Sequence, residues 1–402
     1  MEKLFAVCAP GMEPFTALEL NQLGLLFSHP SCSARESNKL FTGVEEETGG
    51  VSFSGDLKTV YLANLHLRTA SRVLVRLGEF NAAAFSELQK KASRLSWGRY
   101  LVPGQPVAIH VTCHRSRLYH SDAVAERIAE AVGGCLGQPT ELMKYSPGKS
   151  FPDGQVNHQP QLVIVRIVHD LCSISVDSSG ELLHRRGYRL ATAKAPLRET
   201  LAAGMLLASG WDRIAPLIDP FCGSGTIAIE AAMMALGIAP GRSRRFTFMD
   251  WQNYEPGIWD TILEEDSHRK EKQNAGRRTQ LKILASDRDA GAIQIAQANA
   301  SRMRVENDIE FSIRAVSAIQ PTGLGWVVTN PPYGFRVSAG KDLRNLYAQF
   351  GNTLKLKCPL WHVAILCNDF QLLRSTGLQL DTSLSFVNGG ITVRLARGMV
   401  GV

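Results

Sequence analysis

The sequence lacks the features that mark several classes of protein. No apolar run in its 402 residues reaches the roughly 18 residues of a membrane-spanning helix, so we expect no membrane partner. The start, Met1–Phe5, lacks the long apolar run of a secretory signal peptide. The eight cysteines are scattered, with neither a Cys-x-x-Cys pair nor a histidine-rich cluster. This pattern predicts reduced, mostly buried thiols, no metal site and a cytoplasmic location.

What the sequence does contain is a modest excess of basic residues. Its 44 lysines and arginines outnumber 37 acidic residues, and the formal net charge is +7. Such an excess is compatible with a polyanionic partner. Two segments rich in arginine add to this indication. Arginine side chains bind phosphates. Aromatic rings, where exposed, stack on unpaired bases. The candidate RNA-binding residues are Arg115, Arg117 and Tyr119 in the first segment and Arg185, Arg186 and Arg189 in the second.

The run Asn330-Pro331-Pro332-Tyr333 is the most informative motif. It follows the apolar stretch Trp326–Thr329, which predicts a turn at the end of a buried strand. Two consecutive prolines stiffen this turn and fix the Asn330 side chain. An amide and a neighbouring carbonyl can hold an exocyclic amino group while Tyr333 stacks on a flat ring. The motif therefore suggests attack by a nucleobase amino nitrogen on an electrophile, although in isolation it equally predicts a strand-ending turn.

A glycine-rich turn lies about a hundred residues earlier in the sequence. It stands between the apolar Ala215–Ile218 and the helical run Ile227–Leu236, a strand–turn–helix pattern. Gly223 and Gly225 allow a ligand to approach the backbone, and the helix N-terminus presents free N–H groups. The turn matches neither G-x-G-x-x-G nor a P-loop, which requires a lysine. The candidate cofactor-binding residues here are Asp219, Pro220, Cys222, Gly223, Ser224, Gly225 and Thr226.

One more candidate cofactor-binding residue, Asp287, closes the short apolar strand Lys282–Ser286. It precedes the helical stretch Ala290–Ala300. An acidic residue at the end of the second strand of such a sheet commonly binds a ribose diol. Taken alone, the same residue would more often cap the following helix. Since ligands of open α/β sheets bind at the carboxyl ends of the strands, we expect Asp287 to lie beside the glycine-rich turn.

In this order the three motifs resemble those of class I methyltransferases that use S-adenosylmethionine. The upstream segments His184–Arg189, Ala195–Ala203 and Phe53–Asp56 are similar to those of THUMP-domain RNA methyltransferases, especially bacterial enzymes that methylate guanine N2 in large-subunit ribosomal RNA. The resemblance implies S-adenosylmethionine as the cofactor and RNA, foremost 23S ribosomal RNA, as the partner. It implies that the catalytic residues are Asn330, Pro331, Pro332 and Tyr333.

The resemblance, which runs from Phe5 to about Arg397, also implies a domain order. We expect an α+β N-terminal region, made of a ferredoxin-like piece and a THUMP domain, then an α/β Rossmann-like methyltransferase domain with a terminal antiparallel hairpin. The expected parts are 1–55 (ferredoxin-like), 56–178 (THUMP), 179–195 (linker) and 196–402 (catalytic). Asn388-Gly389-Gly390, between two apolar runs, is typical of the expected hairpin.

Three other functions stay open on these residues. A tRNA guanine-N2 methyltransferase would carry the same motifs. An adenine-N6 DNA methylase could use the same Asn-Pro-Pro-Tyr turn, although no DNA-reading motif is evident in the sequence. A non-catalytic RNA-binding protein is indicated by one feature, the missing acid near Ala315, where the family often holds the adenine of the cofactor.

Overall fold

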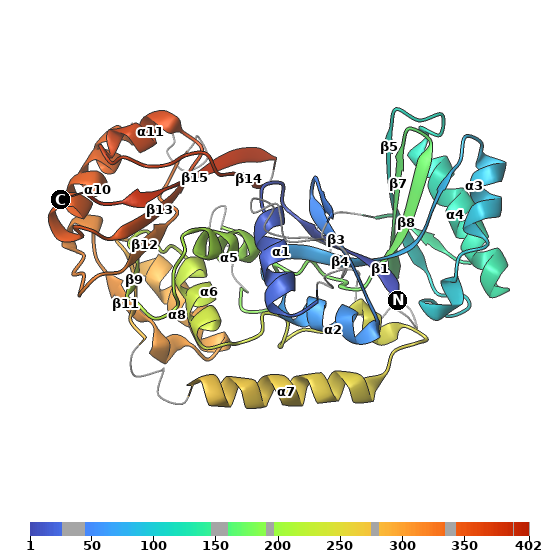
Figure 1. Ribbon diagram of the computed structural model, residues 1–402, viewed down its shortest axis with the longest axis horizontal. Helices are drawn as coiled ribbons and strands as arrows, with labels where there is room; N and C mark the ends of the chain where they lie inside the picture. Colours follow the sequence, from blue (N-terminus) through green and yellow to red (C-terminus); the bar gives the residue numbers. More distant parts are fainter. Residues whose placement is uncertain are drawn as a thin grey trace, which may run out of the picture. The chain divides into compact units, whose positions relative to one another are not determined.

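The structure is a computed structural model that describes residues 1–25, 45–145, 160–189, 197–274, 281–333, 343–388 and 390–401 (Figure 1). The chain forms two compact units. Unit 1 comprises Met1–Val7, Glu19–Leu183 and Arg244–Ile262; unit 2 comprises Cys8–Leu18, His184–Ser243 and Leu263–Val402. The predicted domain boundaries do not follow this division and remain a prediction. Part of the predicted linker, 190–195, lies outside the described residues.

Unit 1 is built on an eight-stranded mixed sheet in the order β2-β3-β1-β4-β8-β7-β5-β6. Its strands are β1 (Glu2–Cys8), β2 (Glu45–Glu47), β3 (Gly50–Gly55), β4 (Ala70–Asn81), β5 (Val107–His114), β6 (Leu142–Met143), β7 (Gln161–Val168) and β8 (Leu171–Asp177). Its helices include α2 (Leu57–His66), α3 (Phe85–Ala92) and α4 (Ser121–Leu136), while α1 (Glu13–Gln22) and α7 (Pro256–Asn274) have residues in both units. This is the α+β architecture that the sequence predicts.

Local chemistry explains several boundaries in unit 1. The helix α2 begins at Asp56, whose carboxylate accepts from the Thr59 backbone N–H at 2.9 Å in a capping box. The β7–β8 hairpin turns through His169 and Asp170, whose φ angles are +51° and +64°. Two residues of positive φ match the twist of the flanking strands. The turn thus has the geometry that favours a tight two-residue hairpin.

Unit 2 is built on a seven-stranded sheet in the order β11-β10-β9-β12-β13-β15-β14. Its strands are β9 (Leu217–Asp219), β10 (Ile283–Asp287), β11 (Glu310–Ile313), β12 (Trp326–Thr329), β13 (His362–Cys367), β14 (Ser385–Asn388) and β15 (Ile391–Met399). Its helices are α5 (Glu199–Ala208), α6 (Thr226–Ala235), α8 (Ala290–Arg302), α10 (Arg344–Lys357) and α11 (Phe370–Ser375). The strands β11, β10, β9, β12 and β13 are parallel to one another, whereas β15 pairs antiparallel with both β13 and β14. The predicted Rossmann-like sheet with a terminal hairpin is therefore confirmed.

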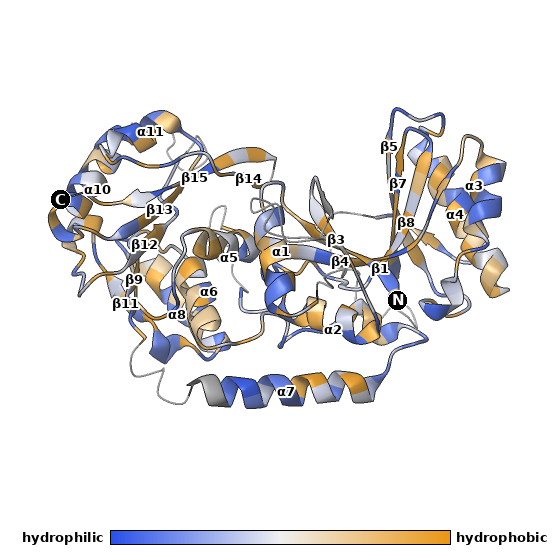
Figure 2. Ribbon diagram, in the orientation of Figure 1, coloured by the Kyte–Doolittle hydropathy of each residue, from blue (hydrophilic) through white to orange (hydrophobic). Residues whose placement is uncertain are grey.

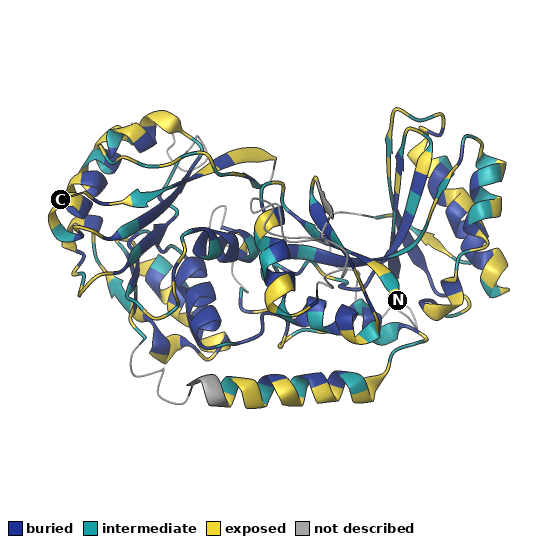
Figure 3. Cartoon of the chain, viewed as in Figure 1, coloured by how far each residue is buried: buried dark blue, intermediate teal, exposed yellow. Residues whose placement is uncertain are grey.

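The sheet of unit 2 is buried on both faces because side chains alternate along its strands. Val328 packs in one core and Val327 in the other. The first core includes α5 and α6, and the second includes α10 and α11. Every residue of α6 is buried, and Figures 2 and 3 show this helix as mostly apolar and buried along its length. The two cores hold the strand ends, and therefore the motifs that follow them, in a rigid frame.

A short N-terminal segment, Cys8–Leu18, belongs to unit 2 although most of the neighbouring sequence belongs to unit 1. Val387 donates its backbone N–H to the Pro10 carbonyl at 3.2 Å. Gly11 has φ +92°, and a Cβ there would lie 2.0 Å from the Ser385 carbonyl oxygen. This position therefore requires glycine both for its backbone conformation and for its closeness to β14.

Within the described residues, no helix is both long and apolar enough to cross a membrane.

Candidate active site

The three motifs meet at one edge of the unit 2 sheet. The strand β9 pairs in parallel with β10 on one side and with β12 on the other. Asp219 is the last residue of β9, Asp287 the last of β10, and Asn330 directly follows β12. Carboxyl ends of parallel strands share an edge, so the sheet brings together residues that lie more than a hundred positions apart in the sequence. The three motifs thus share one sheet edge, and their function as a site remains a prediction.

The glycine-rich turn is anchored to the neighbouring strand and helix. Cys222 donates its backbone N–H to the Ser286 carbonyl at 3.0 Å, and Asn299 on α8 donates its side-chain amide to the Ser224 carbonyl at 3.1 Å. Gly223 and Gly225 have φ angles of +50° and +82°. These conformations favour glycine. A Cβ at Gly223 would meet nothing within 4 Å, whereas a Cβ at Gly225 would lie 2.9 Å from the Ala296 Cβ of α8.

Asp287 bonds to the turn and is not the cap of the next helix. Its Oδ2 accepts from the Gly223 N–H at 3.1 Å, and its Oδ1 accepts from the Asp289 N–H at 3.1 Å. The cap of α8 is Asp289, which accepts from Gly291 and Ala292. An ionised carboxylate offers about four acceptor sites, so Asp287 keeps capacity for a ribose diol. The helix-cap interpretation of Asp287 is therefore wrong; its binding of ribose remains a prediction.

Replacing Asp287 by alanine should weaken binding of S-adenosylhomocysteine by about 1.5–3 kcal/mol, the usual worth of hydrogen bonds to a charged acceptor. Isothermal titration calorimetry measures this loss directly. The matched control is Asp289→Asn, which keeps an oxygen to cap α8 and should leave affinity unchanged. Equal affinities of Asp287→Ala and the wild type would contradict the predicted role.

Asp219 is a buried acid that ties two strand ends together. It is 1% exposed, and its Oδ1 accepts from the Thr329 hydroxyl at 2.6 Å and from the Phe221 N–H at 3.3 Å. Burial raises the pKa of this carboxyl to about 7, and the bond from Thr329 acts in the opposite direction. Because Thr329 precedes Asn330, this bond links the glycine-rich turn to the Asn-Pro-Pro-Tyr turn. A direct contact of Asp219 with the cofactor remains a prediction.

The raised pKa of Asp219 predicts a pH-dependent stability. Its folded-state pKa of about 7 exceeds the ordinary value of 3.8, so the folded state holds the proton more tightly. The stabilisation by this proton is complete below the ordinary pKa of 3.8. It is lost as pH rises toward the folded-state pKa of about 7, by up to about 1.4 kcal/mol of unfolding free energy per pH unit. Asp219→Asn should remove this slope while its Oδ1 still accepts both hydrogen bonds.

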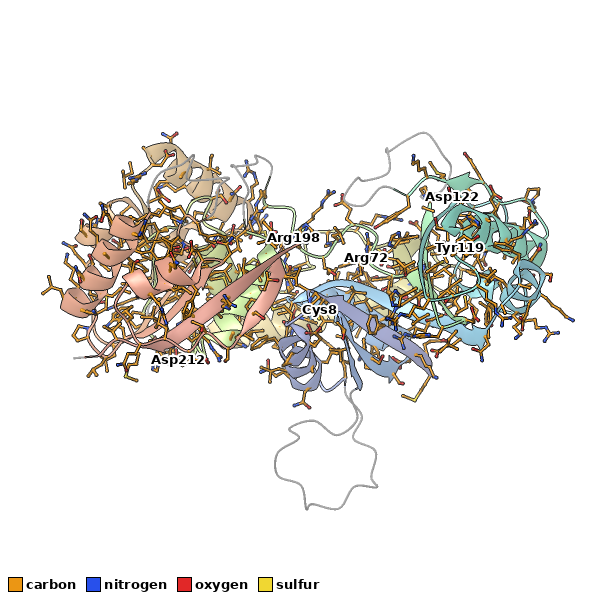
Figure 4. All side chains as sticks on the ribbon, turned by 90° about the horizontal axis from the view of Figure 1, so that it is seen from above. Cys8, Arg72, Tyr119, Asp122, Arg198 and Asp212 are labelled. Atoms are coloured by element: carbon orange, nitrogen blue, oxygen red, sulfur yellow. The ribbon has the colours of Figure 1, made fainter. Side chains whose placement is uncertain are left out.

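Urea unfolding of the cofactor-free protein at several pH values between about 4 and about 7 tests the prediction. The difference in unfolding free energy between variant and wild type should grow with pH. Asp212→Asn, at an exposed acid of unit 2 labelled in Figure 4, is the matched control. Parallel pH profiles for Asp219→Asn and the wild type would count against a raised pKa.

Cys222 in the same turn is a buried thiol. Burial raises the pKa of this thiol far above its ordinary range. A protonated thiol is a poor nucleophile, so the residue is not suited to covalent chemistry.

The Asn330 side chain presents an unused acceptor. Among the described residues its buried Oδ1 has no hydrogen-bond partner. Leaving a buried acceptor unpaired costs about 1–3 kcal/mol, so such an atom needs an explanation, and a ligand is one. The turn behind it is held by Tyr347 of α10, whose hydroxyl donates to the Pro332 carbonyl at 3.4 Å. Tyr333 is half-buried and packs against both cores of unit 2.

The predicted RNA contacts of unit 1 lie on its surface. Arg115 and Arg117 are exposed, and Tyr119, labelled in Figure 4, is 68% exposed. The Tyr119 and His120 rings lie 4.1 Å apart between centroids. The Arg117 backbone N–H donates to the Asp170 carboxylate at 2.7 Å, which fixes the loop to the β7–β8 turn. These side chains are accessible to a large ligand, and their contact with RNA remains a prediction.

The structure corrects the prediction for Arg186. Its side chain is 1% exposed and forms a buried ion pair with Glu230 of α6, at 3.5 Å. A core side chain cannot contact RNA in this conformation, so we remove Arg186 from the candidate RNA-binding residues. The neighbouring Arg189 also bonds inward, donating to the Thr226 hydroxyl at 2.7 Å and to the Leu197 carbonyl at 2.9 Å. Arg185 is only partly buried and stays a candidate.

Several residues of the site were not predicted. Thr329 and Tyr347 hold the motifs in place, and Asn299 orients the glycine-rich turn. None of them belongs to a local motif, and their roles depend on contacts between distant segments. Among the described residues, no group of three or more His, Cys, Asp or Glu side chains is arranged to hold a metal ion.

Comparison with protein families matches most of the chain. Residues 186–397 match the family described as "RMKL-like, methyltransferase domain". Residues 3–74 match the "RlmL ferredoxin-like domain". The first match contains all three motifs of the site, and the second covers the beginning of the chain.

Individual relatives agree with these matches. A Syntrophotalea carbinolica protein named "Ribosomal RNA large subunit methyltransferase K/L" is 33% identical, over 98% of this chain and 53% of its own length. A Synechocystis protein named as a candidate RNA methyltransferase is 31% identical, over 98% of this chain and 95% of its own. The chain thus spans about half the length of the K/L relatives.

Solved structures resemble this chain over its whole length. The crystal structure of a candidate methyltransferase complexed with SAH is 27% identical, with a TM-score of 0.81 over 100% of this chain and 98% of that one.

Proposed function

The chain belongs to the RMKL-like methyltransferase family, and from this premise we propose that it transfers the methyl group of S-adenosylmethionine to an amino group of an RNA base. The K/L relatives' name points to large-subunit ribosomal RNA, so the proposed substrate is 23S ribosomal RNA. The proposed target atom, guanine N2, comes from the resemblance of the sequence motifs. The observation that carries the proposal is the buried Asn330 Oδ1, which has no partner in the described part of the chain and lies at the same sheet edge as the glycine-rich turn and Asp287.

The residues present fit the cofactor. The open space beside Gly223 and the free acceptor sites of Asp287 are features that would hold a nucleoside. S-Adenosylmethionine supplies, when bound, an electrophilic methyl group on a sulfonium. No acidic residue stands at the end of β11, so the adenine would be held there by backbone groups or by Ser317.

Positioning is the main contribution of the protein. The lone pair of guanine N2 is delocalised into the ring, so the amino group must be oriented and polarised. Asn330 Oδ1 accepts one amino N–H and the Pro331 carbonyl accepts the other, which aims the nitrogen at the methyl group. Both oxygens carry partial negative charge and stabilise positive charge as it develops on nitrogen. Tyr333 stacks on the base after it leaves its own helix or loop.

The test of the proposal is methyl transfer to purified RNA. Ribosomal RNA, transfer RNA and DNA from cells that lack the gene would each be incubated with the protein and labelled S-adenosylmethionine, then digested to nucleosides for mass spectrometry. We expect N2-methylguanosine from 23S RNA. N2-Methylguanosine from transfer RNA alone would identify transfer RNA as the substrate in place of ribosomal RNA. N6-Methyladenine in DNA would identify an adenine DNA methylase. No product at all would overturn the proposal.

The surface of unit 1 should contribute RNA affinity. Replacing Arg115 and Arg117 together by alanine should weaken binding of the full chain to RNA. It should also reduce the slope of log K against log salt by about 0.7–0.9 for each phosphate that the protein no longer neutralises. Fluorescence anisotropy over a range of salt concentrations measures both changes. The matched control removes two other exposed arginines, Arg94 and Arg127, and should leave the slope unchanged. Equal slopes for all three proteins would show that this surface does not bind RNA.

A further inference from the structure

A second amide side chain, that of Asn368, has a buried oxygen without a hydrogen-bond partner among the described residues, as Asn330 does. Asn368 directly follows β13, the neighbour of β12 in the parallel sheet, where Thr329 pairs with Ile365. Adjacent strands lie about 4.8 Å apart, so both unpaired oxygens stand at the same edge of the sheet.

One buried hydroxyl brings the two segments together. The Tyr347 oxygen lies 3.4 Å from the Pro332 carbonyl and 3.4 Å from the Cys367 sulfur. Pro332 is two residues after Asn330, and Cys367 immediately precedes Asn368. Burial raises the pKa of the Tyr347 phenol well above its usual range, so the hydroxyl keeps its proton as a donor. The Asn-Pro-Pro-Tyr turn and the end of β13 are therefore held as neighbours.

The backbone on the other side of Asn368 is also held. Asp369 caps α11 by accepting from the Gln371 and Leu372 N–H groups at 2.8 and 3.3 Å. Its own N–H donates to the Cys367 sulfur at 3.4 Å. With both flanking residues bonded, Asn368 is preorganised, and its unpaired oxygen is a ready acceptor.

The hydrogen-bonding groups on the edge of the purine that carries its amino group determine whether such an acceptor finds a donor. Guanine offers three donors there, the N1–H and the two hydrogens of N2, whereas adenine offers two amino hydrogens beside an N1 acceptor. Asn330 and the Pro331 carbonyl account for two donors in the proposed function, on which this inference rests. We propose that Asn368 Oδ1 accepts the N1–H of the target guanine and makes the site select guanine over adenine. Adenine would place its N1 lone pair against Oδ1 and leave that oxygen unpaired.

A base analogue isolates this contact. 2-Aminopurine keeps the 2-amino group but has an acceptor at N1 in place of the N–H. An RNA oligonucleotide spanning the mapped methylation site would carry either guanine or 2-aminopurine at the target position, and kcat/KM would be measured for both. The wild type should prefer guanine roughly 10- to 100-fold, the effect of leaving a buried acceptor unpaired. In Asn368→Leu the preference should fall to about threefold or less.

Two further variants keep the test decisive. Asn368→Asp retains an acceptor and should retain the preference for guanine, even if Asn368→Leu folds poorly. Asn345→Leu makes the same change at an exposed amide of α10 and should behave as the wild type. Affinity for S-adenosylhomocysteine and the thermal midpoint, measured on each variant, identify any loss of folding.

The outcomes separate this inference from the proposed function. A guanine preference that persists unchanged in Asn368→Leu would overturn the role of Asn368 while leaving methylation of guanine intact. A preference lost equally in Asn368→Asp would also overturn it, because an acceptor is present there. A wild-type protein that methylates no guanine would overturn the proposed function itself, and this inference with it.

Discussion

Asn330→Ala is expected to lower the rate of methyl transfer roughly 100- to 1000-fold, the usual effect of losing one preorganised polar group aimed at developing charge. The side chain contributes a buried Oδ1 that no described residue bonds, and alanine removes it while the Pro331-Pro332 turn keeps its shape. Affinity for S-adenosylhomocysteine should barely change, because the contact is made with the base and strengthens as charge develops. Single-turnover transfer to unmethylated RNA measures the rate.

Two controls define the result for Asn330. Asn330→Asp keeps an acceptor oxygen and should retain more activity than Asn330→Ala. Asn345→Ala, at an exposed amide of α10, should have no effect. A rate for Asn330→Ala within a few-fold of the wild type would contradict the assigned role. A parallel loss of cofactor affinity would instead place Asn330 in the cofactor site.

Arg186→Met is expected to destabilise the protein by about 3–5 kcal/mol, the cost of removing one partner from a buried ion pair. Arg186 and Glu230 are 1% and 0% exposed, so methionine fills a similar volume but leaves the Glu230 carboxylate without this counter-charge. Urea unfolding should report a lower unfolding free energy for unit 2.

The comparison variants test whether the ion pair is the cause. Arg186→Met combined with Glu230→Leu should recover most of the lost stability, since an apolar pair can replace a buried ion pair at little cost. Arg185→Met, next to it in sequence and more exposed, should change stability by only about 0.5 kcal/mol. Unchanged stability of Arg186→Met together with weaker RNA binding would restore the original interpretation of Arg186 as an RNA contact.

Segments with strong local signals were predicted well. The stiff turn after Trp326–Thr329 and the glycine-rich turn after β9 stand where the sequence places them. The terminal β14–β15 hairpin is also confirmed. These features depend on a few adjacent residues, such as consecutive prolines, glycines or alternating apolar side chains, so the signal and its cause are both local.

The strand β4 was missed for a physical reason. It pairs with β8 inside the unit 1 sheet, and its residues Arg72, Val73, Leu74 and Val75 are all buried. Alternation therefore breaks down. The buried Arg72 is tolerated because it pairs with Asp177 on β8, a partner more than a hundred positions away. An arginine in the sequence indicates a surface, and only its partner makes it part of the core.

By itself, the sequence determined the strand–turn–helix order, the two turns and Asp287 that define the sheet edge, and the terminal hairpin, because these depend on neighbouring residues. Tertiary structure alone decided which charged side chains are buried, that Cys8–Leu18 packs with unit 2, and that Tyr347 holds two turns together. It also decided that Asn330 and Asn368 follow two paired strands, each with a side-chain oxygen that has no partner among the described residues. Burial and pairing between distant segments depend on packing and strand register, and a local pattern carries no information about either.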